Sequence, residues 1–141
     1  VNPLKPISVT GSAITLNRKN NGGGCIVLDR AAGVAVTLPA AVGSGDEYEV
    51  AVGTTLTSSG TIKVANGTDT MMGVVSIVTD IAGVNMLATG TDDTITMNGS
   101  TTGGLAGSRV KLKDIKAGKW LVSGDLLATG AEATPFSATV S

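Results

Sequence analysis

The side chains best suited to chemistry are two groups of carboxylates. Asp46, Glu47 and Glu49 lie close together, and Asp92 and Asp93 are adjacent. Paired carboxylates serve glycoside hydrolysis and bind Ca²⁺. Alternation places the first group on the solvent-facing side of a predicted strand, and the second group falls in a predicted loop. We therefore interpret both groups as solvated charge, with a calcium site at Asp92 and Asp93 as the alternative.

Other chemistry is limited by residue types that the chain lacks. It has no histidine and a single cysteine, Cys25. Serine and cysteine nucleophiles paired with histidine are thus excluded, as are zinc sites and an intrachain disulfide. The glycines of NNGGG at 20–24 lie between predicted strands, so they indicate a turn and not a phosphate-binding loop. We predict no catalytic residues, no metal and no cofactor, and we do not expect an enzyme.

Four lysines cluster on a predicted hairpin, at Lys111, Lys113, Lys116 and Lys119. Our interpretation is that they keep an edge strand soluble, and the alternative is contact with an acidic surface. Alternation points Lys111 and Lys113 outward and Leu112 inward. Trp120 is the only aromatic residue among the lysines, and alternation points it inward. Because the net charge is only −1, we expect no nucleic-acid partner. No apolar run approaches the roughly 20 residues that span a membrane, and we expect no membrane association.

The elements that position these residues are predicted to be short strands. Glycine accounts for 20 of 141 residues, charged residues for only 15%, and threonine, valine and isoleucine are abundant. Branched side chains favour strands and glycine favours turns. Turn residues recur at intervals that give roughly ten to twelve strands, a pattern typical of a sandwich or barrel. Within residues 46–52, alternation points Tyr48 and Val50 inward, opposite the carboxylates. The sequence therefore predicts an all-β domain over residues 13–141.

Two segments are candidates for contacts with other molecules. Pro3 and Pro6 keep residues 1–12 extended, which predicts an N-terminal arm. Residues 71–79 form the most apolar stretch, and its continuity predicts a strand buried on both faces, by packing or by a subunit contact. Before this stretch, Asn66-Gly67 indicates either a hairpin or a wider turn.

The order of short sequence motifs in residues 24–75 is distinctive. It reads GCIVLDRAAGVAVTLPAAVGSGDEYEVAVGTTLTSSGTIKVANGTDTMMGVV, and the chain closes on AGKWLVSGDLLATGAEATPFSATV at 117–140. In this order, the LDRAAG turn, VTLPAA, the GSG loop and IKVANGTD resemble a recurrent block in small structural proteins of tailed bacteriophages. The resemblance covers most of residues 14–140. It implies a head decoration (cement) protein or a closely related virion structural protein.

The resemblance also implies an assembly and a place in the virion. We expect a homotrimer on the capsid exterior that binds the major capsid protein and stabilises the head; the alternative is a trimeric tail fibre, spike or receptor-binding β domain. The fold is expected to be a single-domain β-sandwich or barrel, jelly-roll-like or β-tulip-like, with the extended arm. The arm residues expected to contact the capsid or another subunit are Val1, Asn2, Pro3, Leu4, Pro6 and Ile7. The residues expected at a trimer or core contact are Met71, Met72, Val74, Val75 and Ile77.

Overall fold

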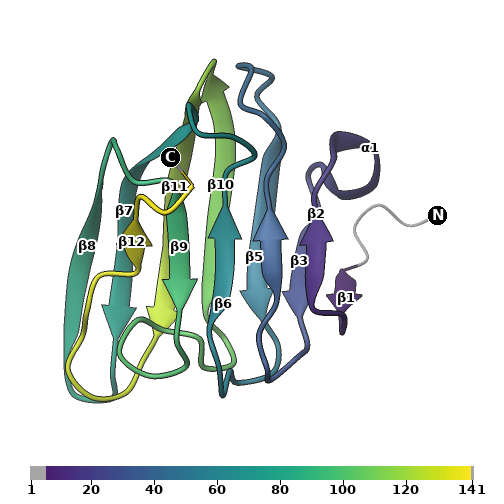
Figure 1. Ribbon diagram of the computed structural model, residues 1–141. Helices are drawn as coiled ribbons and strands as arrows, with labels where there is room; N and C mark the ends of the chain where they lie inside the picture. The colour runs from purple at the N-terminus through teal and green to yellow at the C-terminus, as the bar shows by residue number, and fades with distance from the viewer. Residues whose placement is uncertain (1–5, 141) are drawn as a thin grey trace.

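A computed structural model of the protein describes residues 6–140, and Figure 1 shows two β-sheets packed face to face. The seven-stranded sheet contains, in spatial order, β1 (Ile7–Val9), β3 (Cys25–Leu28), β5 (Glu47–Val52), β10 (Arg109–Lys116), β11 (Lys119–Leu127), β7 (Thr70–Val78) and β8 (Gly83–Thr89). The five-stranded sheet contains β12 (Phe136–Ser137), β9 (Thr94–Met97), β6 (Gly60–Lys63), β4 (Ala35–Thr37) and β2 (Ala13–Thr15). The prediction of an all-β protein is confirmed, and the two packed sheets form a β-sandwich.

In the N-terminal half, successive strands alternate between the two sheets. Strands β1, β3 and β5 pair parallel in the seven-stranded sheet, and β2, β4 and β6 pair parallel in the other. The chain therefore crosses between the sheets after each strand, because parallel neighbours cannot be joined by a tight hairpin. The later strands pair mostly antiparallel, with β11 and β7 as a parallel exception. Sequence alternation alone did not distinguish parallel from antiparallel neighbours.

The crossings correct one sequence interpretation. Strands β6 and β7 belong to different sheets, so Asn66-Gly67 does not close a hairpin. Instead, the Asn66 side chain accepts hydrogen bonds from the backbone N–H groups of Thr68 and Asp69, at 3.0 and 2.9 Å. Asparagine stabilises turns in this way by bonding to the backbone that follows it. The wider turn is the structure that forms.

A single helical turn interrupts the predicted glycine loop. Helix α1 (Arg18–Asn21) begins after Asn17, whose side chain accepts the N–H of Asn20 at 2.9 Å. This contact is an N-cap, which satisfies an otherwise free donor at the start of a helix. The glycines that follow then turn the chain into β3.

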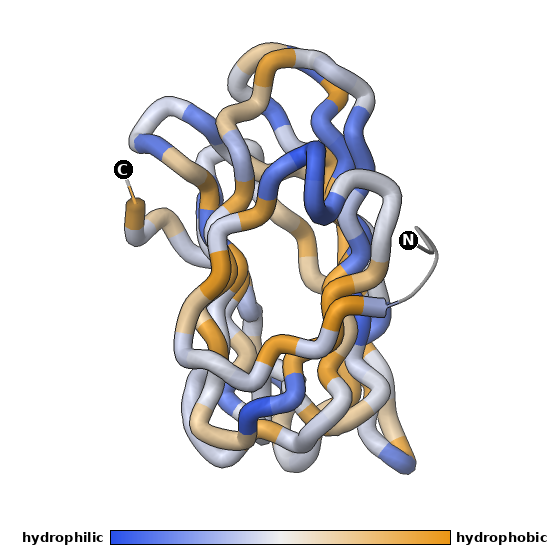
Figure 2. The backbone as a smooth tube through the Cα atoms, turned by 90° about the vertical axis from the view of Figure 1, so that its right-hand side faces the viewer, coloured by the Kyte–Doolittle hydropathy of each residue, from blue (hydrophilic) through white to orange (hydrophobic). Residues whose placement is uncertain are grey.

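The core lies between the sheets and is almost entirely aliphatic. Figure 2, seen from the edge made by β1 and β2, shows the two layers with apolar residues recurring along both. Tyr48 and Trp120 are the largest fully buried side chains, with ring centroids 5.9 Å apart. Both were predicted to point inward, and both predictions are confirmed. The other fully buried large residues include Leu16, Ile26, Leu28, Leu38, Ile62, Met71, Ile77, Ile95, Met97 and Leu112.

Candidate functional site

The outer face of the seven-stranded sheet carries charged residues in columns, because side chains alternate between faces along each strand. Strand β5 presents Glu47 and Glu49, and β10 presents Arg109, Lys111 and Lys113 in antiparallel register beside them. The Nζ of Lys113 lies 3.6 Å from Glu47, and Arg109 lies 3.9 Å from Glu49. These pairs are solvent-exposed, so each contributes little to stability, between about 0 and 1 kcal/mol.

Strand β10 lies inside the sheet, between β5 and β11. The interpretation that its lysines protect an edge strand is therefore wrong. Alternation nonetheless placed Lys111 and Lys113 outward correctly. Lys119 is bound elsewhere, since its Nζ donates to Thr70 Oγ1 at 2.6 Å and to the carbonyl of Gly90 at 3.3 Å.

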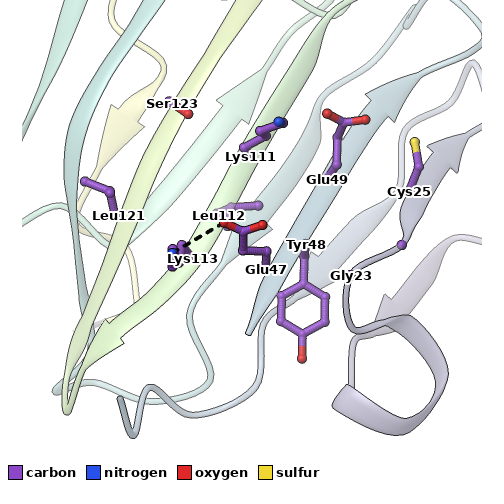
Figure 3. A pocket seen from close by; sticks show the side chains of 11 residues that line it. Gly23, Cys25, Glu47, Tyr48, Glu49, Lys111, Leu112, Lys113, Leu121 and Ser123 are labelled. Carbon is purple, nitrogen blue, oxygen red and sulfur yellow. Dashed lines mark ion pairs between the residues drawn. The ribbon is translucent and has the colours of Figure 1, made fainter. Parts of the chain in front are cut away.

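A shallow groove of about 370 Å³ runs across this charged area. Figure 3 shows Cys25, Glu49 and Lys111 in that order on three neighbouring strands, with the ion pair between Lys113 and Glu47 nearby. The groove is lined by Gly23, Gly24, Cys25, Glu47, Tyr48, Glu49, Lys111, Leu112, Lys113, Leu121 and Ser123. Acid and base stand next to each other in it, so the charges largely satisfy one another.

Cys25 lies at the edge of this groove, opposite Glu49 in the parallel register of β3 and β5. Burial, the negative charge of Glu49 and a hydrogen bond to Glu49 all raise the pKa of the Cys25 thiol. A raised pKa lowers the fraction of thiolate, which is the reactive form. The arrangement is the opposite of an activated nucleophile.

The same outer face becomes apolar on the strands beyond β10. Leu121 on β11 stands opposite Met72 on β7, and Val74 on β7 stands opposite Leu87 on β8. We call these four residues the apolar strip. Their exposed fractions range from 38% for Met72 to 63% for Leu87. Large side chains in neighbouring positions on three strands make a contiguous exposed patch, which in soluble proteins is typical of an interaction site.

The residues predicted at a trimer or core contact divide between the two faces of β7. Met71, Val75 and Ile77 are fully buried in the core, whereas Met72 and Val74 belong to the apolar strip. The interpretation that packing within the chain buries both faces is wrong, because no other layer of the described chain covers the outer face. A subunit contact there stays a prediction.

The predicted arm of residues 1–12 includes a strand. Residues 7–9 form β1, and Ile7 pairs with Ile26 of β3 while remaining 37% exposed. Pro6 is exposed just before it. Val1, Asn2, Pro3 and Leu4, the other residues predicted to make contacts, lie outside the described residues.

The carboxylates singled out from the sequence do not form a common site. Asp46 pairs with Arg18 at 3.2 Å. Asp92 accepts a hydrogen bond from the N–H of Thr89 at 2.8 Å. Asp93 is fully buried and accepts a hydrogen bond from the N–H of Thr139 at 2.9 Å, so the interpretation of Asp93 as solvated charge is wrong. Within residues 6–140, no group of three or more cysteine and carboxylate side chains gathers around a point where a metal ion could bind.

Three buried aspartates hold loops in place, and sequence reasoning missed two of them. Asp114 accepts backbone N–H groups from Val42 at 3.0 Å and Gly43 at 2.7 Å, together with the hydroxyl of Ser44 at 2.9 Å. Asp69 accepts the N–H of Ala41 at 2.8 Å. Together they hold the crossing from β4 to β5. Alternation was the available signal for Asp114, since it follows the inward Val110 and Leu112 of β10.

The hydrogen bonds at Asp114 outweigh its burial. Burial acts to raise the pKa of this carboxyl, but the N–H groups of Val42 and Gly43 and both donors of Ser44 lower it, and the pKa lies below its ordinary value. A carboxylate that accepts several donors is stabilised in its charged form. Asp114 is thus a structural anion and not a proton donor.

Comparison with known protein families, with curated proteins and with solved structures found no match to this chain. Among the described residues, no helix has the length and apolar character needed to cross a bilayer. The outer face of the seven-stranded sheet is therefore described by its own geometry. It has a charged half, in which acidic residues of β5 lie beside basic residues of β10, a shallow groove and the apolar strip.

Proposed function

We propose that the chain is a bacteriophage capsid decoration, or cement, protein that binds the outer capsid as a homotrimer and stabilises the head. The apolar strip is the observation that carries this proposal. The sheet face exposes Met72, Val74, Leu87 and Leu121 to water. Covering it with another protein surface lowers the free energy, because apolar side chains are removed from water. The phrases LDRAAG, VTLPAA and IKVANGTD give the class of protein by resemblance.

The buried aspartates support the same proposal. A protein that clamps neighbouring capsid subunits has to keep its shape under load, which depends on buried area and fixed loops and needs no reactive group. Asp114 and Asp69 hold the β4–β5 crossing, and Asp93 holds the C-terminal segment near Thr139 and Val140. A jelly-roll-like or β-tulip-like classification of the sandwich belongs to this proposal.

The pairing of charges supports a binding role over catalysis. Around the groove, Glu47 and Glu49 face basic residues of β10, and burial together with Glu49 suppresses the thiolate of Cys25. Catalytic sites instead hold a nucleophile or acid in a perturbed, reactive state. The proposed partners are the major capsid protein and further copies of this chain, with neither nucleic acid nor membrane.

The strip can be tested by placing a charge in it. We expect Val74→Asp to abolish trimer formation in light scattering and to reduce occupancy on purified capsids, because burying an unpaired carboxylate is costly. Thr61→Asp is the matched control, since Thr61 points outward from β6 in the other sheet. Unchanged mass and unchanged occupancy for Val74→Asp, at wild-type stability, would remove the strip from the proposal.

The arm needs a separate test. Deleting residues 1–5 leaves Ile7 and the rest of β1 in place, so stability is expected to stay unchanged while capsid binding weakens. Full occupancy of capsids by the truncated chain would rule out the arm as a contact. Imaging of virions gives the location directly: density on the head supports decoration, whereas density on the tail supports the fibre or receptor-binding alternative.

A further inference from the structure

The sandwich has four edges, and three of them are short. Strands β1 and β2 have three residues each, and β12 has two and follows Pro135. Strand β8 has seven residues, GVNMLAT, without a charge or a proline. Figure 1 shows it at the side of the seven-stranded sheet farthest from β1. Proteins usually protect long edges with charges, prolines or bulges, because an open edge accepts another strand.

The register shows which backbone groups of β8 point away from the sheet. The N–H of Thr79 donates to the carbonyl of Ala82, so Thr79 and Ala82 form a hydrogen-bonded pair. Every second pair from there along β7 and β8 is also hydrogen-bonded, including Ile77 with Val84 and Val75 with Met86. In an antiparallel ladder the intervening residues direct both backbone groups outward. These residues are Gly83, Asn85, Leu87 and Thr89.

One of the four is already satisfied. The N–H of Thr89 donates to Asp92 at 2.8 Å, which closes that end of the edge. No hydrogen bond within the described chain reaches the outward backbone groups of Gly83, Asn85 or Leu87. All three residues are solvent-exposed. The open part of the edge is therefore centred on Asn85.

We propose that β8 pairs antiparallel with β8 of a second copy of this chain, about a two-fold axis at Asn85. Each Asn85 would face its own mate, and Gly83 of one copy would face Leu87 of the other. The three outward N–H groups of each copy would then donate across the axis.

The side chains fit this register. On the outer face, Gly83 leaves room for Leu87, which is 63% exposed in the single chain. On the inner face, Val84, which is 40% exposed, comes opposite the partly buried Met86. Strand β8 has no charge that would repel its copy across the axis. The match of the strand with itself favours a second copy over an unrelated partner.

This contact goes beyond the proposed function, since a two-fold contact differs from the three-fold contacts of a trimer. An isologous pair also closes after two copies, so it covers the edge without open-ended growth. A single strand pair lies below the roughly 1,200 Å² of a standard interface. We therefore expect weak association that increases with protein concentration.

A disulfide test reports the register directly. In a Cys25→Ser background, Asn85→Cys would bring two sulfur atoms together, because the Cα atoms of a hydrogen-bonded antiparallel pair lie about 5.5 Å apart, within the roughly 4.4–6.8 Å that a disulfide spans. Thr89→Cys is the matched control on the same strand and face. Its mate would lie about eight residues away, roughly 27 Å at about 3.4 Å per residue.

We expect mild oxidation to link Asn85→Cys into covalent pairs in several-fold greater yield than Thr89→Cys. Equal yields, or no linked Asn85→Cys, would overturn the register. Hydrogen exchange on the unmodified chain guards against a misfolded variant. Protection of the Gly83, Asn85 and Leu87 amides should rise with protein concentration, and protection that is independent of concentration would overturn the pairing itself.

Discussion

Replacing Asp114 by asparagine tests whether buried carboxylates hold the crossing between the sheets. The side chain is 2% exposed and accepts four hydrogen bonds, from the N–H groups of Val42, Gly43 and Ser44 and from the Ser44 hydroxyl. Asparagine keeps the shape but turns one oxygen into an NH₂ donor. In the better of its two orientations, this donor faces only the N–H of Gly43, which loses its acceptor.

The cost follows from that one lost acceptor. A buried donor left unsatisfied costs about 1–3 kcal/mol, so we expect Asp114→Asn to lower the free energy of unfolding by about 2 kcal/mol. For a chain of this length the melting temperature should fall by about 8 °C, at about 4 °C per kcal/mol. Urea denaturation and thermal melting measure the two quantities.

Asp125→Asn is the control, because Asp125 is 52% exposed and pairs with Arg109 on the surface. Its replacement should change the free energy of unfolding by less than about 1 kcal/mol. If Asp114→Asn proved as stable as this control, the hydrogen bonds to the 42–44 loop would not hold the crossing, and the reasoning would fail.

The pH dependence gives a second measurement on the same residue. The pKa of Asp114 is lower in the folded chain than its ordinary value of 3.8, so the unfolded chain binds this proton more readily. The stabilisation is complete above the ordinary pKa and is lost as the pH falls through the folded pKa. Between pH 5 and the acid limit, the wild-type chain should therefore lose more stability than Asp114→Asn.

Two further predictions concern backbone positions. Gly73→Ala should destabilise the chain by at least about 3 kcal/mol in urea denaturation, because an added Cβ would meet the carbonyl oxygen of Val122; Gly45→Ala, which also has a positive φ but open space around it, should cost only about 1 kcal/mol. Asp93→Ala should speed hydrogen exchange at Thr139 and Val140, whose N–H groups Asp93 accepts; unchanged exchange there would show that the C-terminal segment is held by other contacts.

The sequence predicted the strands well because alternation is a local property. The inward positions of Tyr48, Val50, Leu112 and Trp120 all followed from counting every second residue, and all are buried. The same pattern appears whether neighbours run parallel or antiparallel. The alternation of β1 to β6 between the two sheets was therefore not predictable, since it depends on which distant strand lies beside each one.

The predictions that the lysines lie on an edge strand and that packing buries both faces of the apolar stretch were wrong for a related reason. Lys111 and Lys113 point outward, but β10 lies inside the sheet because β5, which is far away in the sequence, pairs with its second edge. Met72 and Val74 are apolar residues of the kind found in a core, and nevertheless they lie on an open face of the sheet. A composition of this kind indicates that a face is covered, without saying whether the same chain or another one covers it.

The apolar strip and the β8 edge are adjacent, so the two proposed contacts need to be separated. Val74 contributes a side chain to the outer face, whereas the edge uses the backbone of β8 around Asn85. Val74→Asp, added to the Cys25→Ser, Asn85→Cys chain, should therefore abolish the trimer in light scattering while the disulfide-linked pair still forms on oxidation. If the charge at Val74 removed both species at unchanged stability, the strip and the edge would be parts of one interface, and the two-fold pair would not exist apart from the trimer.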